Sequence, residues 1–309
     1  MTDLVVTAGG TAPPSPRPWR GVNRVFRRHN GLAVTALIGP AVGWLLLVYI
    51  ASLVLLVVSA FFRLDGFTGE PTSELTLDNV ERAFTTRSFL DVVVRSVAIA
   101  ASVTVLCLVI ALPAAFYIAK VARPWARRGL IVAVLMPLWA GYLVKGYAWK
   151  AMLRPASPFG VDTSGGVLDA VFGWTPGFGY VAVVLALGYL WLPFMVLPIY
   201  AGLERLPQSL MEASGDLGAR PWRTFGGVIV PMLIPSIAAG SIFTFSLSLG
   251  DYITPRLVTE GSVTMVGNII YSTLLAPNQP LAAAYTLWPL LIIIGYLLAM
   301  RRIGAFESL

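Results

Sequence analysis

Six long apolar stretches constrain this chain more than any other feature. They run over Leu37–Phe62, Val92–Ala119, Leu130–Leu153, Phe178–Leu203, Val228–Gly250 and Leu281–Met300. About 20 apolar residues in a helix cross the roughly 30 Å of hydrocarbon in a bilayer, so each stretch is long enough to span it. Lipid offers no hydrogen-bond partner to an open strand, so the spans must be helices. With 57% hydrophobic and 12% charged residues, the chain is predicted to be an all-α membrane protein with six transmembrane helices.

The distribution of positive charge predicts how these spans are oriented. Of the 22 Lys and Arg residues, fourteen fall in the N-terminal tail, in alternate loops and after the last span, and five fall in the intervening loops. Because cytoplasmic segments carry the excess of Lys and Arg, both ends are expected inside. The predicted organisation is a basic cytoplasmic tail at 1–36, a six-helix domain at 37–303 and a short tail at 304–309. The loop at 204–227 then lies on the cytoplasmic side.

Composition limits the chemistry that the chain can carry. It has one cysteine, Cys107, and one histidine, His29, so it can form neither an internal disulfide nor a Cys/His metal cage. The net charge of +7 follows membrane topology, so nucleic acid is not an expected partner. No catalytic or metal-binding residues are predicted, and the chain is not expected to be an enzyme.

The loop between the fourth and fifth spans has the pattern of a short, rigid helix. Pro207 cannot continue the preceding helix, and Gln208–Asp216 is long enough for about two further turns. Gly218 can adopt the left-handed conformation that ends a helix, and Pro221 suits the first turn of the next one. The sequence therefore predicts a helix, a sharp turn and a second helix at the cytoplasmic membrane face.

This loop resembles the EAA motif of permease subunits of bacterial ABC importers. The resemblance rests on Glu212-Ala213-Ser214, then Gly218-Ala219, followed by an apolar helix; Ser214 stands where the family usually has alanine. It implies a type I importer permease in the bacterial cytoplasmic (inner) membrane, with this loop as the coupling helix that docks on an ATPase subunit. The coupling residues that it implies are Glu212, Ala213, Ser214, Asp216, Leu217, Gly218 and Ala219.

Two other stretches narrow the resemblance to spermidine/putrescine-type permeases. They are residues 137–153, PLWAGYLVKGYAWKAML, and residues 245–268, which contain Gly-Asp-Tyr-Ile-Thr-Pro. This resemblance implies import of a small organic solute, with a polyamine expected, by alternating access. The implied partners are a second permease subunit, a pair of ATPase subunits, an extracytoplasmic substrate-binding protein and membrane lipid.

The lysines give an independent indication that ATP is hydrolysed elsewhere. A phosphate-binding P-loop needs Gly-Lys-Ser/Thr, but the three lysines of this chain are followed by Val121, Gly146 and Ala151. We therefore expect no cofactor on this chain and place ATP and magnesium on the partner ATPase.

Polar and aromatic residues toward the outer face are candidates for the substrate pathway. A carboxylate beside an aromatic ring attracts an amine by charge and cation–π contact, and aromatic rings also line passages or form interfacial belts. Lys145 and Lys150 either extend to the interface or pair with a carboxylate such as Asp251. The candidate pathway residues are Asp251, Tyr252, Trp139, Tyr142, Tyr147 and Trp191.

Two other function classes fit the sequence less well than an ABC importer permease. A self-sufficient secondary transporter or channel is expected to carry acids inside its spans for ion coupling, and here none lies at the middle of a span. An intramembrane enzyme has too few His, Cys and acidic residues to draw on. Within the ABC importer class, an amino acid or a thiamine-like cation stays open as the solute.

Overall fold

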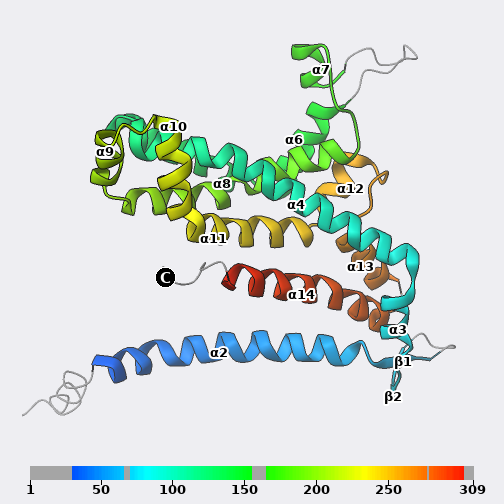
Figure 1. Cartoon of the computed structure of the whole chain (residues 1–309). Coiled ribbons are helices and arrows are strands. Elements are labelled where there is room, and N and C mark those ends of the chain that lie inside the picture. Colours follow the sequence, from blue (N-terminus) through cyan, green and yellow to red (C-terminus); the bar gives the residue numbers. More distant parts are fainter. Residues whose placement is uncertain (1–29, 66–69, 155–164, 277, 303–309) are drawn as a thin grey trace, which may run out of the picture. The chain divides into compact units, whose positions relative to one another are not determined.

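The computed structural model describes residues 30–65, 70–154, 165–276 and 278–302, with the side chains of 30–37 and 73 left undescribed. The predicted C-terminal tail and most of the predicted N-terminal tail lie outside these residues. The described part is helical apart from a small hairpin (Figure 1). Its elements are α2 Asn30–Ser59, β1 Phe62–Leu64, β2 Pro71–Leu75, α3 Asp78–Thr85, α4 Arg87–Phe116, η1 Tyr117–Val121, α5 Pro124–Trp139, α6 Tyr142–Leu153, α7 Val167–Phe172, α8 Tyr180–Arg205, α9 Gln208–Asp216, α10 Pro221–Thr224, η2 Phe225–Ile229, α11 Val230–Leu249, α12 Ile253–Thr259, α13 Val266–Leu275 and α14 Gln279–Arg302.

The chain divides into two units, Met1–Leu56 and Val57–Leu309, and each is described by itself. The first unit holds most of α2, which contains the apolar span Ile38–Ser59 with a mean hydropathy of 2.7. The second unit holds all the other described elements and every candidate site described below.

The core of the second unit lies where α4, α8 and α11 pack against one another (Figure 1). Small residues let these helices approach closely. A methyl group placed on Gly240 of α11 would lie 3.2 Å from the backbone of Met195 in α8, which is closer than most real contacts. Van der Waals packing of this kind holds helices together where lipid removes the hydrophobic driving force.

The six predicted spans are confirmed, and the third is broken. Five described helical segments are long and apolar enough to cross a bilayer, and a sixth span is made by α5 and α6 together. The predicted span Leu130–Leu153 is made of two helices: α5 begins at Pro124, and it meets α6 at 96°. The break is made by Ala140 and Gly141, whose extended backbone conformations (ψ 137° and 141°) cannot continue a helix.

Different elements lie at the two ends of the core that α4, α8 and α11 form. Figure 1 shows α9 and α10 at one end of α4, α8 and α11, and α12 and α13 at the other. The helices α12 and α13 lie between the fifth and sixth spans, where no helix was predicted. The 20 residues of α11 separate the two ends by about 30 Å, at 1.5 Å per residue.

Candidate functional site

The segment from α9 to α10 has the conformation that the sequence predicts. The helix α9 covers Gln208–Asp216, and Gly218 follows in the left-handed region with φ 78°. The N–H of Ala219 donates to the carbonyl of Ser214 at 3.1 Å, and the N–H of Gly218 donates to the carbonyl of Gly215 at 2.8 Å. These paired bonds form a Schellman motif, which ends a helix and reverses the chain with few free dihedral angles.

One side of α9 is attached to the rest of the chain. The hydroxyl groups of Ser214 and Thr224 are 2.9 Å apart and share a hydrogen bond that joins α9 to α10. Met211 packs against the main hydrophobic core. Serine at 214, where the family motif usually has alanine, therefore has a bonding partner in this structure.

The opposite side of α9 is exposed. Glu212, Ala213 and Asp216 are exposed, and Leu217 is 89% exposed. This side of the fixed helix therefore presents Leu217 and two carboxylates that no described residue covers.

Polar contacts hold the end of α8 that leads into α9. The ammonium group of Lys120 donates to the carbonyl of Leu206 at 2.9 Å. Arg127 of α5 forms an ion pair with Glu204 and donates through Nε to the hydroxyl of Tyr200 at 2.7 Å. The Tyr200 hydroxyl donates in turn to Glu204 at 2.6 Å. A force on α9 therefore acts on α5 and α8 together.

Two π-helical turns flank the same region. The turn η1 follows α4, and η2 leads into α11. Phe116 directly precedes η1 and Phe225 is the first residue of η2; their rings meet edge to face with centroids 5.3 Å apart. Pro231 explains η2, because its ring would clash with the carbonyl of Gly227 in an ideal α-helix. Such π-turns are often found at functional positions.

At the other end of the core, Asp251 organises a buried polar cluster. Its side chain is 7% exposed. Its Oδ1 accepts the N–H groups of Ile253 and Thr254, both at 3.0 Å, which satisfies the first turn of α12. Its Oδ2 accepts the hydroxyl groups of Thr254, at 3.0 Å, and of Tyr142. Burial raises the pKa of the Asp251 carboxyl, and these hydrogen bonds oppose the rise.

The structure brings together three of the six predicted pathway residues. Tyr142 binds Asp251, and its ring stacks on Trp191 with centroids 6.2 Å apart. Tyr252 points elsewhere and stacks on Tyr271 at 4.6 Å. The remaining two, Trp139 and Tyr147, are exposed, with Trp139 at 91%. Whether any of the six contacts a solute stays a prediction.

The two span-three lysines differ in their surroundings. Lys150 pairs with Glu260 at 3.0 Å. Lys145 is buried and has no ion-pair partner within the described ranges. The predicted alternative of pairing with a carboxylate is therefore confirmed for Lys150, although the carboxylate is Glu260. Neither lysine binds Asp251, whose oxygens accept the hydrogen bonds described above.

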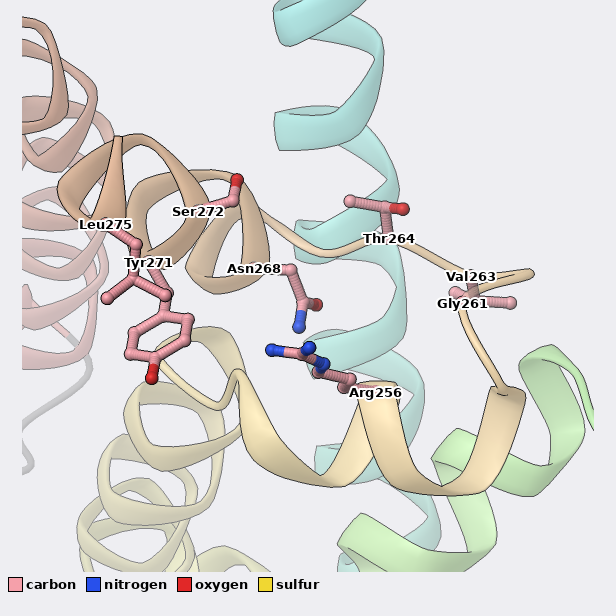
Figure 2. A pocket seen from close by; sticks show the side chains of 8 residues that line it. All are labelled: Arg256, Gly261, Val263, Thr264, Asn268, Tyr271, Ser272 and Leu275. Atoms are coloured by element: carbon pink, nitrogen blue, oxygen red, sulfur yellow. The ribbon is translucent and has the colours of Figure 1, made fainter. Parts of the chain in front are cut away.

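A pocket of about 390 Å³ opens between α12 and α13. Figure 2 shows the guanidinium group of Arg256 and the amide group of Asn268 pointing toward one another across it. Its lining consists of Arg256, Gly261, Val263, Thr264, Asn268, Tyr271, Ser272 and Leu275.

Some residues of the sites described above were not predicted from the sequence. Thr224, Arg127, Tyr200 and Arg256 act through partners far away in the chain, so no local pattern marks them. Thr254 is the exception, because an Asp three residues before a Thr at a helix start is a recognisable capping pattern.

Comparison with known proteins decides the family. Residues 87–305 match the family model described as "Binding-protein-dependent transport system inner membrane component". The chain belongs to this family. It is an ABC importer permease, and with its six spans it is a multi-pass protein of the bacterial inner membrane.

Curated relatives place it more closely within this permease family. It is 41% identical over 305 residues to the inner membrane ABC transporter permease protein YdcU of Escherichia coli, covering 95% of this chain and 97% of that protein. It is 33% identical to the spermidine/putrescine transport system permease protein PotB of Haemophilus influenzae, covering 79% of this chain and 84% of that protein. The predicted resemblance is confirmed.

A solved structure confirms the fold of this permease. A chain from the crystal structure of a bacterial alginate ABC transporter, in complex with an alginate pentasaccharide-bound periplasmic protein, matches with a TM-score of 0.63 and 14% identity. The match covers 94% of this chain and 97% of that chain. The predicted type I importer permease fold is therefore confirmed.

Proposed function

We propose that this permease imports a polyamine, and that α9 is the element through which a separate ATPase drives it. The observation that carries the coupling role is the geometry of α9: a short helix ended by a Schellman motif, with one side bonded to α10 and the core, and the other side exposed. A rigid element of this kind transmits a displacement to the spans that it joins, whereas an unstructured loop would absorb it.

The proposed assembly has the chemistry divided among its chains. The permease pairs with a second permease subunit, each docks on one ATPase of a pair, and an extracytoplasmic binding protein delivers the solute. ATP and magnesium belong to the ATPase, and this chain has no catalytic role of its own. Closing of the ATPase pair moves the coupling helices together and exchanges the side to which the passage opens.

The test of coupling is a charge reversal at Glu212. We expect Glu212→Arg to lose the ATPase during copurification and to lose ATP-driven uptake, because the exposed carboxylate then presents the wrong charge to its partner. Glu81→Arg, on the exposed face of α3 at the other end, is the matched control and should retain both. Full uptake by Glu212→Arg with the ATPase still bound would contradict the proposal.

The support for a polyamine comes from the relatives and from two stacked aromatic rings, those of Tyr142 and Trp191. PotB of Haemophilus influenzae, 33% identical, is a spermidine/putrescine permease protein by name. The rings of Tyr142 and Trp191 stack beside the Asp251 carboxylate, and aromatic faces attract organic cations.

Uptake of labelled solutes into vesicles that hold the complete transporter and its binding protein tests this. Competition by spermidine and putrescine, with none from amino acids or thiamine, is the expected result. Competition only by an amino acid or thiamine would reject the polyamine and leave the coupling role intact. Uptake without any ATPase would reject the coupling role, whichever solute competes, and favour a secondary transporter.

A further inference from the structure

The pocket between α12 and α13 presents hydrogen-bond donors, and no acid is found among the described residues that line it. Arg256 carries five N–H donors, and it has no hydrogen bond or ion pair within the described part of the chain. The hydroxyl of Tyr271 is likewise without a hydrogen bond among the described residues. A pocket with this lining attracts an anion and repels a cation.

The network around Asn268 fixes which of its atoms faces the pocket. Its Oδ1 accepts the N–H of Met265 at 3.0 Å, and its Nδ2 donates to the carbonyl of Tyr252. An amide nitrogen has two N–H groups, so one stays available. Figure 2 shows this nitrogen directed at the guanidinium group of Arg256. Two donors from two different helices therefore converge on one space.

We propose that this pocket receives a carboxylate side chain of the extracytoplasmic binding protein. A guanidinium fork matches the two oxygens of a carboxylate, and the Asn268 N–H supplies a third donor. Leu275, which is 68% exposed, provides apolar surface for the methylene groups of a glutamate. The inference rests on the proposed function, because it takes the imported solute to be a cation that this pocket would repel.

The place of the pocket in the fold agrees with such a partner. It lies beyond α11, at the end of the core away from α9, so a cytoplasmic α9 puts the pocket on the outer side (Figure 1). Arg256 is exposed there. The family to which the chain belongs is named for its dependence on a binding protein. Charge complementarity at this contact would set both the affinity and the orientation of docking.

The test measures binding of the purified binding protein to the complete transporter in nanodiscs, at low and at high ionic strength. We expect Arg256→Ala to weaken binding at low ionic strength by about tenfold and to flatten its salt dependence, since a charge-assisted bond is lost. Arg256→Lys keeps the positive charge but cannot donate two parallel hydrogen bonds, so its affinity should lie between those of the wild type and Arg256→Ala. Arg82→Ala, an exposed arginine of α3, is the matched control and should bind like the wild type.

The charge-reversed variant Arg256→Glu distinguishes a loss of docking from a misfolded permease. We expect Arg256→Glu to bind more weakly than Arg256→Ala, and a lysine in place of the facing acid of the binding protein to restore affinity. Equal binding by wild type and Arg256→Ala would overturn the inference. So would import of a free dicarboxylate such as succinate that is lost in Arg256→Ala, because the pocket would then serve a solute. If the wild type itself binds no binding protein and shows no ATP-driven uptake, the proposed function fails instead.

Discussion

The hydroxyl of Tyr142 donates a hydrogen bond to the carboxylate of Asp251 and so joins the first residue of α6 to the segment that follows α11. The two residues are 109 positions apart. The bond holds the second half of a broken span at the position where its helix starts again, and Thr254 completes the cluster. The bend between α5 and α6 is thus tied to a single buried acid.

Removing this hydroxyl should destabilise the permease. We expect Tyr142→Phe to lower the free energy of unfolding by about 1–3 kcal/mol, because a buried carboxylate loses a donor. Tyr147→Phe is the control, since Tyr147 is exposed and its hydroxyl has no hydrogen bond among the described residues. Thermal unfolding in detergent measures both, and equal melting temperatures for the two variants would contradict the role of the bond.

The same cluster predicts a pH dependence of stability. Burial raises the folded-state pKa of Asp251 above its ordinary value of 3.8, so the folded state holds this proton more tightly than the unfolded state. The resulting stabilisation is complete below pH 3.8 and is lost as the pH rises through the folded-state pKa. Asp251→Asn should therefore show a flatter decline of melting temperature from pH 3.8 upward than the wild type. Superimposable profiles would show that Asp251 does not titrate in this way.

Glycine is needed at 218 and not at 215. Gly218 has φ 78°, so Gly218→Ala should cost about 1 kcal/mol through the backbone alone, as an added methyl meets nothing within 4 Å. Gly215→Ala, in the helix and equally uncrowded, should stabilise α9 by up to about 1 kcal/mol.

Uptake and ATPase association distinguish the two glycine variants. Gly218→Ala should lose part of both, since the turn that orients α9 is strained. Gly215→Ala should keep both. A loss of function in Gly215→Ala alone would mean that flexibility inside α9, and not its rigidity, matters for coupling.

The cluster of Arg127, Tyr200 and Glu204 should contribute more than an ordinary surface pair. Glu204→Gln is expected to lower the melting temperature and the uptake rate, because three hydrogen-bonded groups hold the end of α8. Glu74→Gln removes the pair with Arg63 at 3.4 Å, whose side chains are 64% and 72% exposed. Exposed pairs contribute roughly 0–1 kcal/mol, so this control should change little. A larger effect of Glu74→Gln on uptake would refute the link between the cluster and coupling.

The sequence by itself determined the spans and the local conformation of the segment from α9 to α10. The length of an apolar stretch is enough to define a membrane helix. The local chemistry of proline and glycine sets the bounds of α9, the left-handed Gly218 and the start of α10 at Pro221. The residues that set this conformation are contiguous in the chain, so it could be predicted without the fold.

Only the tertiary structure decided what those elements hold and how the third span bends. Tyr142 meets Asp251, Ser214 meets Thr224, and Arg256 faces Asn268 because helices from separate parts of the chain pack side by side. Local conformational preference acts over a few residues, whereas these contacts depend on which helix faces are buried together. That information is a property of the packed core and is carried by no short stretch of sequence.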